Sequence, residues 1–383
     1  GDGRPGAAGL QRLITAQRDQ VARDRLHAEV MRLPREDTRR EAWLACDAFS
    51  SQWIGSWPSE RDAISPQEFP EVLATYLGRE SPGVRRLAGQ AIPDCQRQRV
   101  CDAFGIQLGL AQLTDRAHGE CHDAIAATIF RDVLHSGVHG STEPYHLFSA
   151  VLPPRRLVRA EDGRGGGEGC SVIPDAELHV RMTEARVDRC RPEQRWRGTA
   201  TQRGPMQRYA ARQLFDVKTI HGGNPDYRSA RASGEDGQSG AVAQRAYRVH
   251  RDYELHAHDL DLRDDVRAHN AGRTDAVAAA LGQYPQVRAL CVGQYGEAST
   301  DVHELLDIAV KRATRDSWRF LGARSQAEAR SYFTSSMRRA WGVAFVREMA
   351  RHRVSRLCFV GATRRPGARA ARAQAAGQLA AWA

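Results

Sequence analysis

Asp216 and Lys218 are the residues whose types and spacing most clearly could do chemistry. They lie in the stretch 214–221, whose alternation of residues with period two predicts a β-strand that stops at Gly222-Gly223. Residues two apart on a strand point to the same side of a sheet. The acid and the ammonium therefore share a face among apolar neighbours, where an unpaired charge is costly. They could form a structural ion pair, or the carboxylate could hold a divalent metal ion beside the lysine.

Composition makes Lys218 informative. The chain has 56 basic residues, of which only Lys218 and Lys311 are lysines. Arginine supplies a generic positive charge, but it does not supply the compact, titratable charge of an ammonium group. A lysine two residues after a strand aspartate therefore favours a chemical role over chance.

Asp175 is a second acid in a comparable setting. Residues 172–180 predict a strand entered through Pro174, with Asp175 near its start. Mg²⁺ takes one or two protein carboxylates, and waters and phosphate oxygens complete its shell. An ion held by two such acids can activate water and neutralise charge at phosphorus, while Lys218 orients the water or stabilises charge. These parts suit phosphodiester hydrolysis.

The elements around these residues predict an α/β fold. The middle of the chain reads as a helix from residue 122, strands near 143–152, 172–180 and 214–221, a helix over 241–258, a strand over 287–292 and a further helix. Such an order predicts a mixed sheet with helices on both faces. On either side we expect an all-helical region over 1–95, a helical extension over 316–361 and a frayed tail over 362–383.

Pro174-Asp175 followed by Asp216-Val217-Lys218 resembles the Pro-Asp…(Asp/Glu)-x-Lys signature of restriction-endonuclease-like nucleases. In that superfamily the two acids bind the catalytic metal, and the lysine acts with the attacking water. The surrounding His122-Asp123 and Glu143-Pro144 are similar to a region near the carboxyl end of non-LTR retrotransposon polyproteins, after the reverse transcriptase.

The resemblance implies a restriction-endonuclease-like mixed sheet flanked by helices over residues 115–315. It also implies a metal-dependent, retroelement-derived endonuclease that hydrolyses DNA phosphodiester bonds, with Mg²⁺ or alternatively Mn²⁺. Asp175 and Asp216 would be the metal ligands, and Lys218 the charge on the water side.

Four further residues are candidates for the same site. Asp123 and Glu143 could supply the extra acid that such nucleases often take from the first helix or strand. Asp123 could instead be a helix cap, and this is the favoured interpretation. Glu143 could instead be a turn residue. Gln244 and Tyr247 lie where nucleases of this class carry residues that touch DNA, although their polarity also suits a surface helix.

Residues 96–122 form a degraded Cys/His segment or linker. Cys101 survives from the Cys/His knuckle of retroelement proteins, but Gln107 stands where a histidine is expected. True zinc sites usually show close cysteine pairs, and none follows here. We therefore expect free thiols and surface histidines rather than zinc. The separation of Asp175 from Asp216 is also longer than is usual in the family.

These departures leave two other functions open. One is a catalytically inactive, nucleic-acid-binding remnant of such a nuclease. The other is an interaction protein in which Asp216 and Lys218 form a structural ion pair. The net charge of +10 favours a polyanionic partner, for which nucleic acid, and DNA in particular, is expected.

Several classes are disfavoured by the sequence. No stretch approaches the roughly 20 apolar residues of a membrane span, and no signal peptide opens the chain. The glycine-rich stretch 163–169 lacks the Gly-Lys-Ser/Thr ending of a P-loop, so it predicts a flexible surface loop. No small-molecule cofactor is expected. The scattered cysteines predict an intracellular protein, with the nucleus as one candidate compartment. The start at Gly1 leaves open that the chain is a piece of a longer product.

Overall fold

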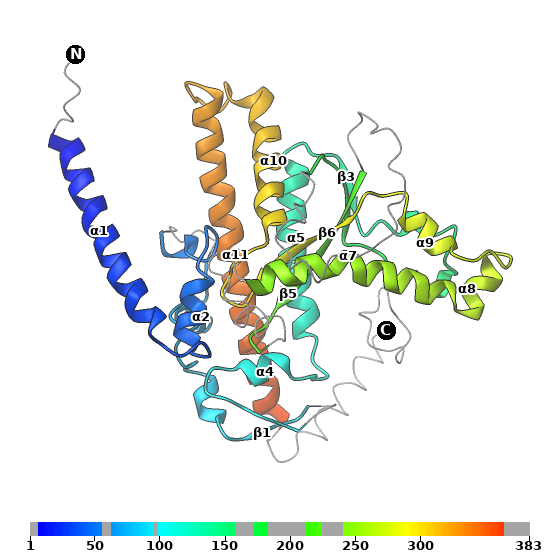
Figure 1. The fold of residues 1–383 in the computed structure, drawn as a ribbon, viewed down its shortest axis with the longest axis horizontal. Coiled ribbons are helices and arrows are strands. Elements are labelled where there is room, and N and C mark those ends of the chain that lie inside the picture. The colour runs from blue at the N-terminus through cyan, green and yellow to red at the C-terminus, as the bar shows by residue number, and fades with distance from the viewer. Residues whose placement is uncertain are drawn as a thin grey trace.

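The core of the protein is a four-stranded mixed sheet flanked by helices (Figure 1). The computed structural model describes residues 7–55, 63–94, 98–157, 172–182, 212–223 and 240–363. The strand order is β3-β4-β5-β6; β4 is antiparallel to both of its neighbours, and β5 and β6 are parallel. The predicted α/β class with a mixed sheet is therefore confirmed. The strands are β3 (Gly140–Thr142), β4 (Ala176–His179), β5 (Arg212–Ile220) and β6 (Val287–Gly293).

Helices account for most of the remaining described chain. Two short strands, β1 (Ala91–Ile92) and β2 (Arg99–Val100), form a separate antiparallel pair. The expectation that residues 1–95 are all-helical is therefore wrong at its C-terminal end, where the chain pairs with the next segment instead. Single 3-10 turns occur at η1 (Gln52–Gly55), η2 (Val84–Leu87), η3 (Tyr145–Leu147) and η4 (Pro154–Arg156). The helices are α1 (Ala7–Met31), α2 (Thr38–Leu44), α3 (Phe69–Tyr76), α4 (Ile106–Leu110), α5 (Ala117–His135), α7 (Gly240–Asp261), α8 (Asp264–His269), α9 (Ala276–Leu281), α10 (Thr300–Ser317) and α11 (Gln326–Thr363).

The two faces of β5 face two different hydrophobic cores. Phe215 and Val217 pack with apolar residues of α5, α10 and α11. Leu214 and Ile220 pack instead with α7 and α9. This alternation follows from the period-two geometry of a strand. It places Asp216 on the side of the sheet that α7 covers.

The crossover from β5 to β6 runs through α7, α8 and α9. Parallel neighbours cannot be joined by a hairpin, so the connection must cross over a face of the sheet. Figure 1 shows α7 running across the sheet, while α5, α10 and α11 stand side by side. The elements that carry Asp175, Asp216 and Lys218 thus lie between two helical layers.

The N-terminal helical region packs directly on the long helix α11. The Phe49 ring lies in the core beside Trp341 and Phe345, with ring centroids 6.2 and 5.4 Å away. Helix α11 continues through Gly342, where a Cβ atom would lie 2.4 Å from the Phe49 carbonyl oxygen. The close approach requires glycine. The domain limits expected from the sequence stay predictions.

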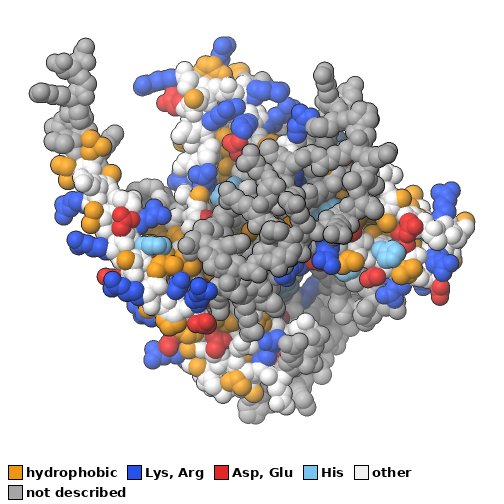
Figure 2. Space-filling model, in the orientation of Figure 1, with side chains coloured by type: hydrophobic (Ala, Val, Ile, Leu, Met, Phe, Trp, Pro, Cys, Tyr) orange, Lys and Arg blue, Asp and Glu red, His pale blue; other side chains and the backbone are white. Residues whose placement is uncertain are grey.

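Basic side chains are spread widely over the protein. Figure 2 shows Lys and Arg side chains along α1, around α8 and α9, and at the turn between α10 and α11. Within the described ranges, no helix combines the length and the apolar character that crossing a membrane requires.

Candidate active site

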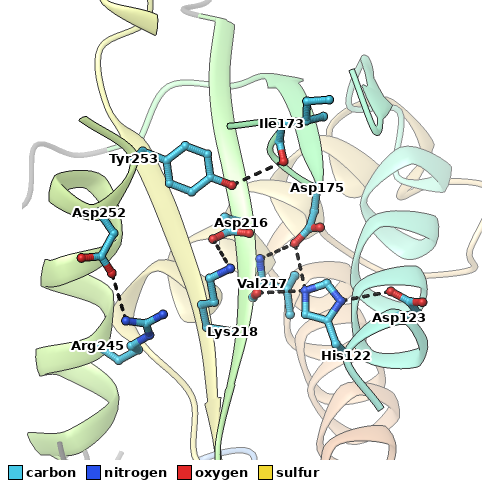
Figure 3. A network of polar contacts seen from close by, with 10 residues as sticks. All are labelled: His122, Asp123, Ile173, Asp175, Asp216, Val217, Lys218, Arg245, Asp252 and Tyr253. Atoms are coloured by element: carbon cyan, nitrogen blue, oxygen red, sulfur yellow. Dashed lines mark hydrogen bonds and ion pairs between the residues drawn. The ribbon is translucent and has the colours of Figure 1, made fainter. Parts of the chain in front are cut away.

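Asp175 lies where β4 begins to leave β5. The register pairs Ala176 with Phe215, and its antiparallel continuation puts Asp175 beside Asp216. Because β4 starts at Ala176, the Val217 N–H lies beyond the ladder, and it donates to Asp175 Oδ2 at 2.6 Å (Figure 3). The side chain thus replaces a strand carbonyl and is buried. This bond holds the first acid against the middle of β5.

Asp216 and Lys218 form an ion pair on β5, with 2.7 Å between Lys218 Nζ and Asp216 Oδ2. Burial raises the pKa of Asp216 to about 6, against the opposing effect of the Lys218 charge. Burial alone would lower the pKa of Lys218, but the neighbouring Asp216 carboxylate outweighs it and raises that pKa. Near neutral pH both groups are therefore charged.

His122, on α5, completes the polar cluster as a cation. Its Nδ1 lies 3.1 Å from Asp123 Oδ1, and its Nε2 lies 3.0 Å from the Val217 carbonyl oxygen and 3.3 Å from Asp175 Oδ2. A carbonyl and a carboxylate only accept, so both ring nitrogens must carry protons. Burial opposes this charge, but the hydrogen bonds to Asp123 and Asp175 raise the pKa of His122 to about 10.

The pKa of Asp175 shifts in the opposite direction, below its usual value. Burial would raise its pKa, but the hydrogen bond and charge of His122 and the N–H of Val217 lower it to about 2. Asp175 and Asp216 are thus two carboxylates balanced by two cations, His122 and Lys218. His122 also pairs with the Asp123 carboxylate on its other side.

The cluster has the donor atoms for a metal ion. Ligand atoms of His122, Asp175 and Asp216 all lie within 4.8 Å of one another. Carboxylate oxygens suit hard cations such as Mg²⁺ and Mn²⁺. Because the Nε2 of His122 carries a proton in this arrangement, the atoms that remain able to receive a cation are the oxygens of the two aspartates.

Asp123 does not cap a helix, so the favoured interpretation of this residue is wrong. Helix α5 begins at Ala117, more than a turn earlier, with Arg116 at the N-cap position. The apolar stripe extends in that direction because Ala117 and Cys121 are buried one turn apart. Asp123 instead lies inside the helix, where it accepts from His122.

Glu143 lies beside Asp175 but turns its carboxylate outward. Its backbone N–H donates to the Asp175 carbonyl at 2.8 Å, and its φ is 48°. The exposed carboxylate accepts from Tyr145 Oη at 3.4 Å. This contact agrees with the interpretation as a turn residue. The carboxylate is not part of the group of ligand atoms formed by His122, Asp175 and Asp216.

Gln244 and Tyr247 lie on α7, as expected. Tyr247 is 45% exposed. Within the described residues the buried Gln244 Oε1 has no hydrogen-bond partner. Between them, Arg245 lies close enough to Lys218 for the two positive charges to repel, and it donates to Asp252 at 3.0 Å (Figure 3). Arg245 thus approaches the site from the α7 side.

Sequence reasoning missed His122 and Arg245 as site residues. The sequence around His122 predicts a surface histidine. The adjacent acid and the second histidine four residues earlier were the signals that could have indicated a site residue. Arg245 follows Gln244 on a helix with many arginines, so no local signal separates it from its neighbours. Only its proximity to Lys218 on β5 identifies Arg245 as a residue near the site.

Comparison of the chain with protein-family models, with curated proteins and with solved structures found no match. The geometry of the side chains is therefore what indicates a function.

Proposed function

We propose that the chain is a Mg²⁺-dependent endonuclease of the restriction-endonuclease-like class, acting on DNA. The observation that carries the proposal is the meeting of Asp175 and Asp216 on neighbouring strands, with ligand atoms within 4.8 Å and the Lys218 ammonium 2.7 Å from Asp216. Two acids that can hold a metal ion, with an ammonium group beside them, suit metal-assisted phosphodiester hydrolysis.

The fold and the charge support the same proposal. The resemblance to restriction-endonuclease-like and retroelement proteins implies a mixed sheet between helical layers, with the acids on adjacent strands. The chain has such a sheet, with β4 and β5 antiparallel neighbours and helices on both faces. Its net charge of +10 suits a polyanionic substrate.

Each residue has a defined task in this proposal. Asp175 and Asp216 would hold the Mg²⁺ ion, or Mn²⁺ in its place, which supplies water activation and charge neutralisation when bound. Lys218 is protonated near neutral pH, because Asp216 raises its pKa despite burial. It therefore acts as a hydrogen-bond donor and positive charge toward water or phosphate, not as a base. His122 and the Val217 N–H orient the Asp175 carboxylate.

A plasmid-nicking assay with Mg²⁺ or Mn²⁺ tests the proposal. We expect Asp216→Asn and Lys218→Gln each to slow nicking by on the order of 100-fold or more. The chain offers a matched control in its only other lysine, because Lys311 pairs with Asp307 on the exposed side of α10. Asp307→Asn and Lys311→Gln should nick at the wild-type rate. Unchanged nicking by Asp216→Asn would contradict the proposal.

A second candidate function is nucleic-acid binding without cleavage. It is favoured by the position of the His122 imidazolium, which already bonds the Val217 carbonyl and lies beside Asp175 where a cation would bind. This candidate predicts DNA binding that weakens steeply with salt, as counterion release requires, and no nicking with either metal. Binding measured from low to high salt alongside the nicking assay separates the two.

A further inference from the structure

Three histidines meet outside the candidate active site, near the start of α5. One of them, His118, lies one helical turn before His122. His118 lies in the first turn of α5, His221 directly follows β5, and His352 lies on α11. One ring nitrogen from each lies within 4.8 Å of the other two. The ring centroids are 5.3 Å apart for His118 and His221, 6.0 Å for His118 and His352, and 4.3 Å for His221 and His352.

Two ring nitrogens of the cluster are buried without a partner among the described residues. Within the described part of the chain, the buried Nε2 atoms of His221 and His352 have no hydrogen-bond partner. An unsatisfied buried nitrogen is costly, and in native proteins it calls for a water, an ion or another ligand. Beside these two rings lies a cavity of about 10 Å³, also lined by Met349 and Gln294. It has room for about one small occupant.

The histidines are in the protonation state that metal binding needs. Burial lowers the pKa values of His221 and His352 well below their usual range, and the pKa of His118, which lies exposed at the edge of the cluster, is also lowered. Neutral imidazole keeps a lone pair for a metal, whereas imidazolium does not. His118 and His122, only one turn apart, are thus held in opposite states: the first neutral, the second charged.

The two arginines closest to the cluster are each paired with an acid. Arg353 lies 3.4 Å from Glu71, and Arg356 lies 3.8 Å from Asp115. Arg356 also donates to the carbonyls of α4 and the residue after it. Each arginine therefore has an acid beside it, although Arg353 also lines the cavity, and both arginines still lower the pKa values of His221 and His352. Three imidazoles are a donor set that selects Zn²⁺ and similar ions over Mg²⁺.

We propose that His118, His221 and His352 bind a divalent transition-metal ion of the Zn²⁺ class. Zn–N bonds of 2.0–2.1 Å at tetrahedral angles place ligand nitrogens about 3.4 Å apart, so the rings need to close by at most about 1.4 Å. The fourth position is open to water. The ion clamps α5, β5 and α11 together, next to the turn of α5 and the stretch of β5 that carry His122 and Lys218.

This inference does not depend on nuclease activity, and it departs from the expectation of free thiols and surface histidines without zinc. In the Cys/His segment, Cys101 and Cys121 are buried and belong to no disulfide, while Cys95 lies outside the described residues. The partners of His118 are not these cysteines. They are histidines distant in sequence, brought together by the packing of α5, β5 and α11.

Co²⁺ titration of the chelator-treated full-length chain tests the site. Co²⁺ absorbs visible light much more strongly in a four-coordinate nitrogen site than in its six-coordinate aqueous form. We expect one equivalent of Co²⁺ to develop such absorption, excess Zn²⁺ to abolish it, and Mg²⁺ to leave it unchanged. His221→Gln and His352→Gln should each weaken binding at least about tenfold.

Two controls make the result decisive. His258→Gln, on α7 with a side chain 61% exposed, should bind Co²⁺ like the wild type. Asp216→Asn should also bind normally, because it alters only the candidate active site. Circular dichroism checks that each variant is folded. Any of three outcomes would overturn the proposal. The wild type could fail to develop strong absorption, the folded His221→Gln and His352→Gln variants could bind Co²⁺ as tightly as the wild type, or Asp216→Asn could be the one variant that loses binding.

Discussion

The carboxylate of Asp175 accepts the backbone N–H of Val217 at 2.6 Å, which ties the start of β4 to the middle of β5. A charge-assisted hydrogen bond of this kind is short and strong. This hydrogen bond holds the Asp175 carboxylate beside His122. Asp216, the residue before Val217 on β5, pairs with Lys218 instead. The two acids are therefore held by different cations, and each cation can be removed separately.

Removal of the His122 charge should strengthen metal binding at the aspartates. The imidazolium lies between the Asp175 carboxylate and the Val217 carbonyl, so it competes with an incoming cation. We expect His122→Gln to raise the affinity for Mn²⁺ on the order of tenfold, measured by titration calorimetry. The comparison should be made in a His352→Gln background to disable the three-histidine cluster. A loss of affinity would instead identify His122 as a ligand.

The two lysines of the chain should differ sharply in their effect on stability. Lys218→Gln leaves the buried Asp216 carboxylate without its ion-pair partner, whereas Lys311→Gln disrupts an exposed pair on α10. Because the Lys218 side chain is 32% exposed, we expect a loss of roughly 2 kcal/mol, below that of a fully buried pair. Lys311→Gln should cost about 0–1 kcal/mol. Urea denaturation measures both, and equal losses would contradict the difference in burial.

Gly342→Ala should destabilise the contact between the N-terminal region and α11. The added Cβ would lie 2.4 Å from the Phe49 carbonyl oxygen, which belongs to backbone and cannot swing aside. We expect a loss of about 1–3 kcal/mol in the free energy of unfolding. Gly361→Ala lies on the same helix with nothing within 4 Å, so it should be neutral or stabilising by up to about 1 kcal/mol. Thermal unfolding of the pair provides the check.

Acid should weaken the chelator-treated protein through its three neutral histidines. Burial lowers the pKa of His118 to about 4 from 6.5, so below pH 6.5 the unfolded chain binds more protons than the folded chain. This contribution to stability is present above pH 6.5 and is lost as the pH falls toward 4. The raised pKa of His122 acts in the opposite sense, with stability lost as the pH rises toward 10.

The comparison of wild type with His352→Gln isolates the effect of the cluster, since both retain His122. Denaturation at pH 7, 6 and 5 with a chelator present should show a shallower decline in the variant. Parallel curves for the two proteins would show that His352 does not remain neutral in the folded state.

Local pattern was enough to predict β5 and the common face of Asp216 and Lys218. The period-two alternation around them fixes side-chain direction whatever the strand packs against. The same reasoning predicted the mixed sheet and the helices on its two faces. It failed at the start of α5, because Asp123 resembled a cap while the buried Ala117 and Cys121 extend the helix by more than a turn.

Contacts between distant elements were beyond such reasoning. The charge of His122 depends on the Val217 carbonyl and on Asp175, which reach it only after α5 packs against β5. His118, His221 and His352 share no local pattern, and their meeting requires α11 to lie against α5. The sequence by itself determined which residues share a strand face, because that depends on backbone geometry. The tertiary structure alone decided which histidine is charged and which three converge, because burial and long-range packing set both.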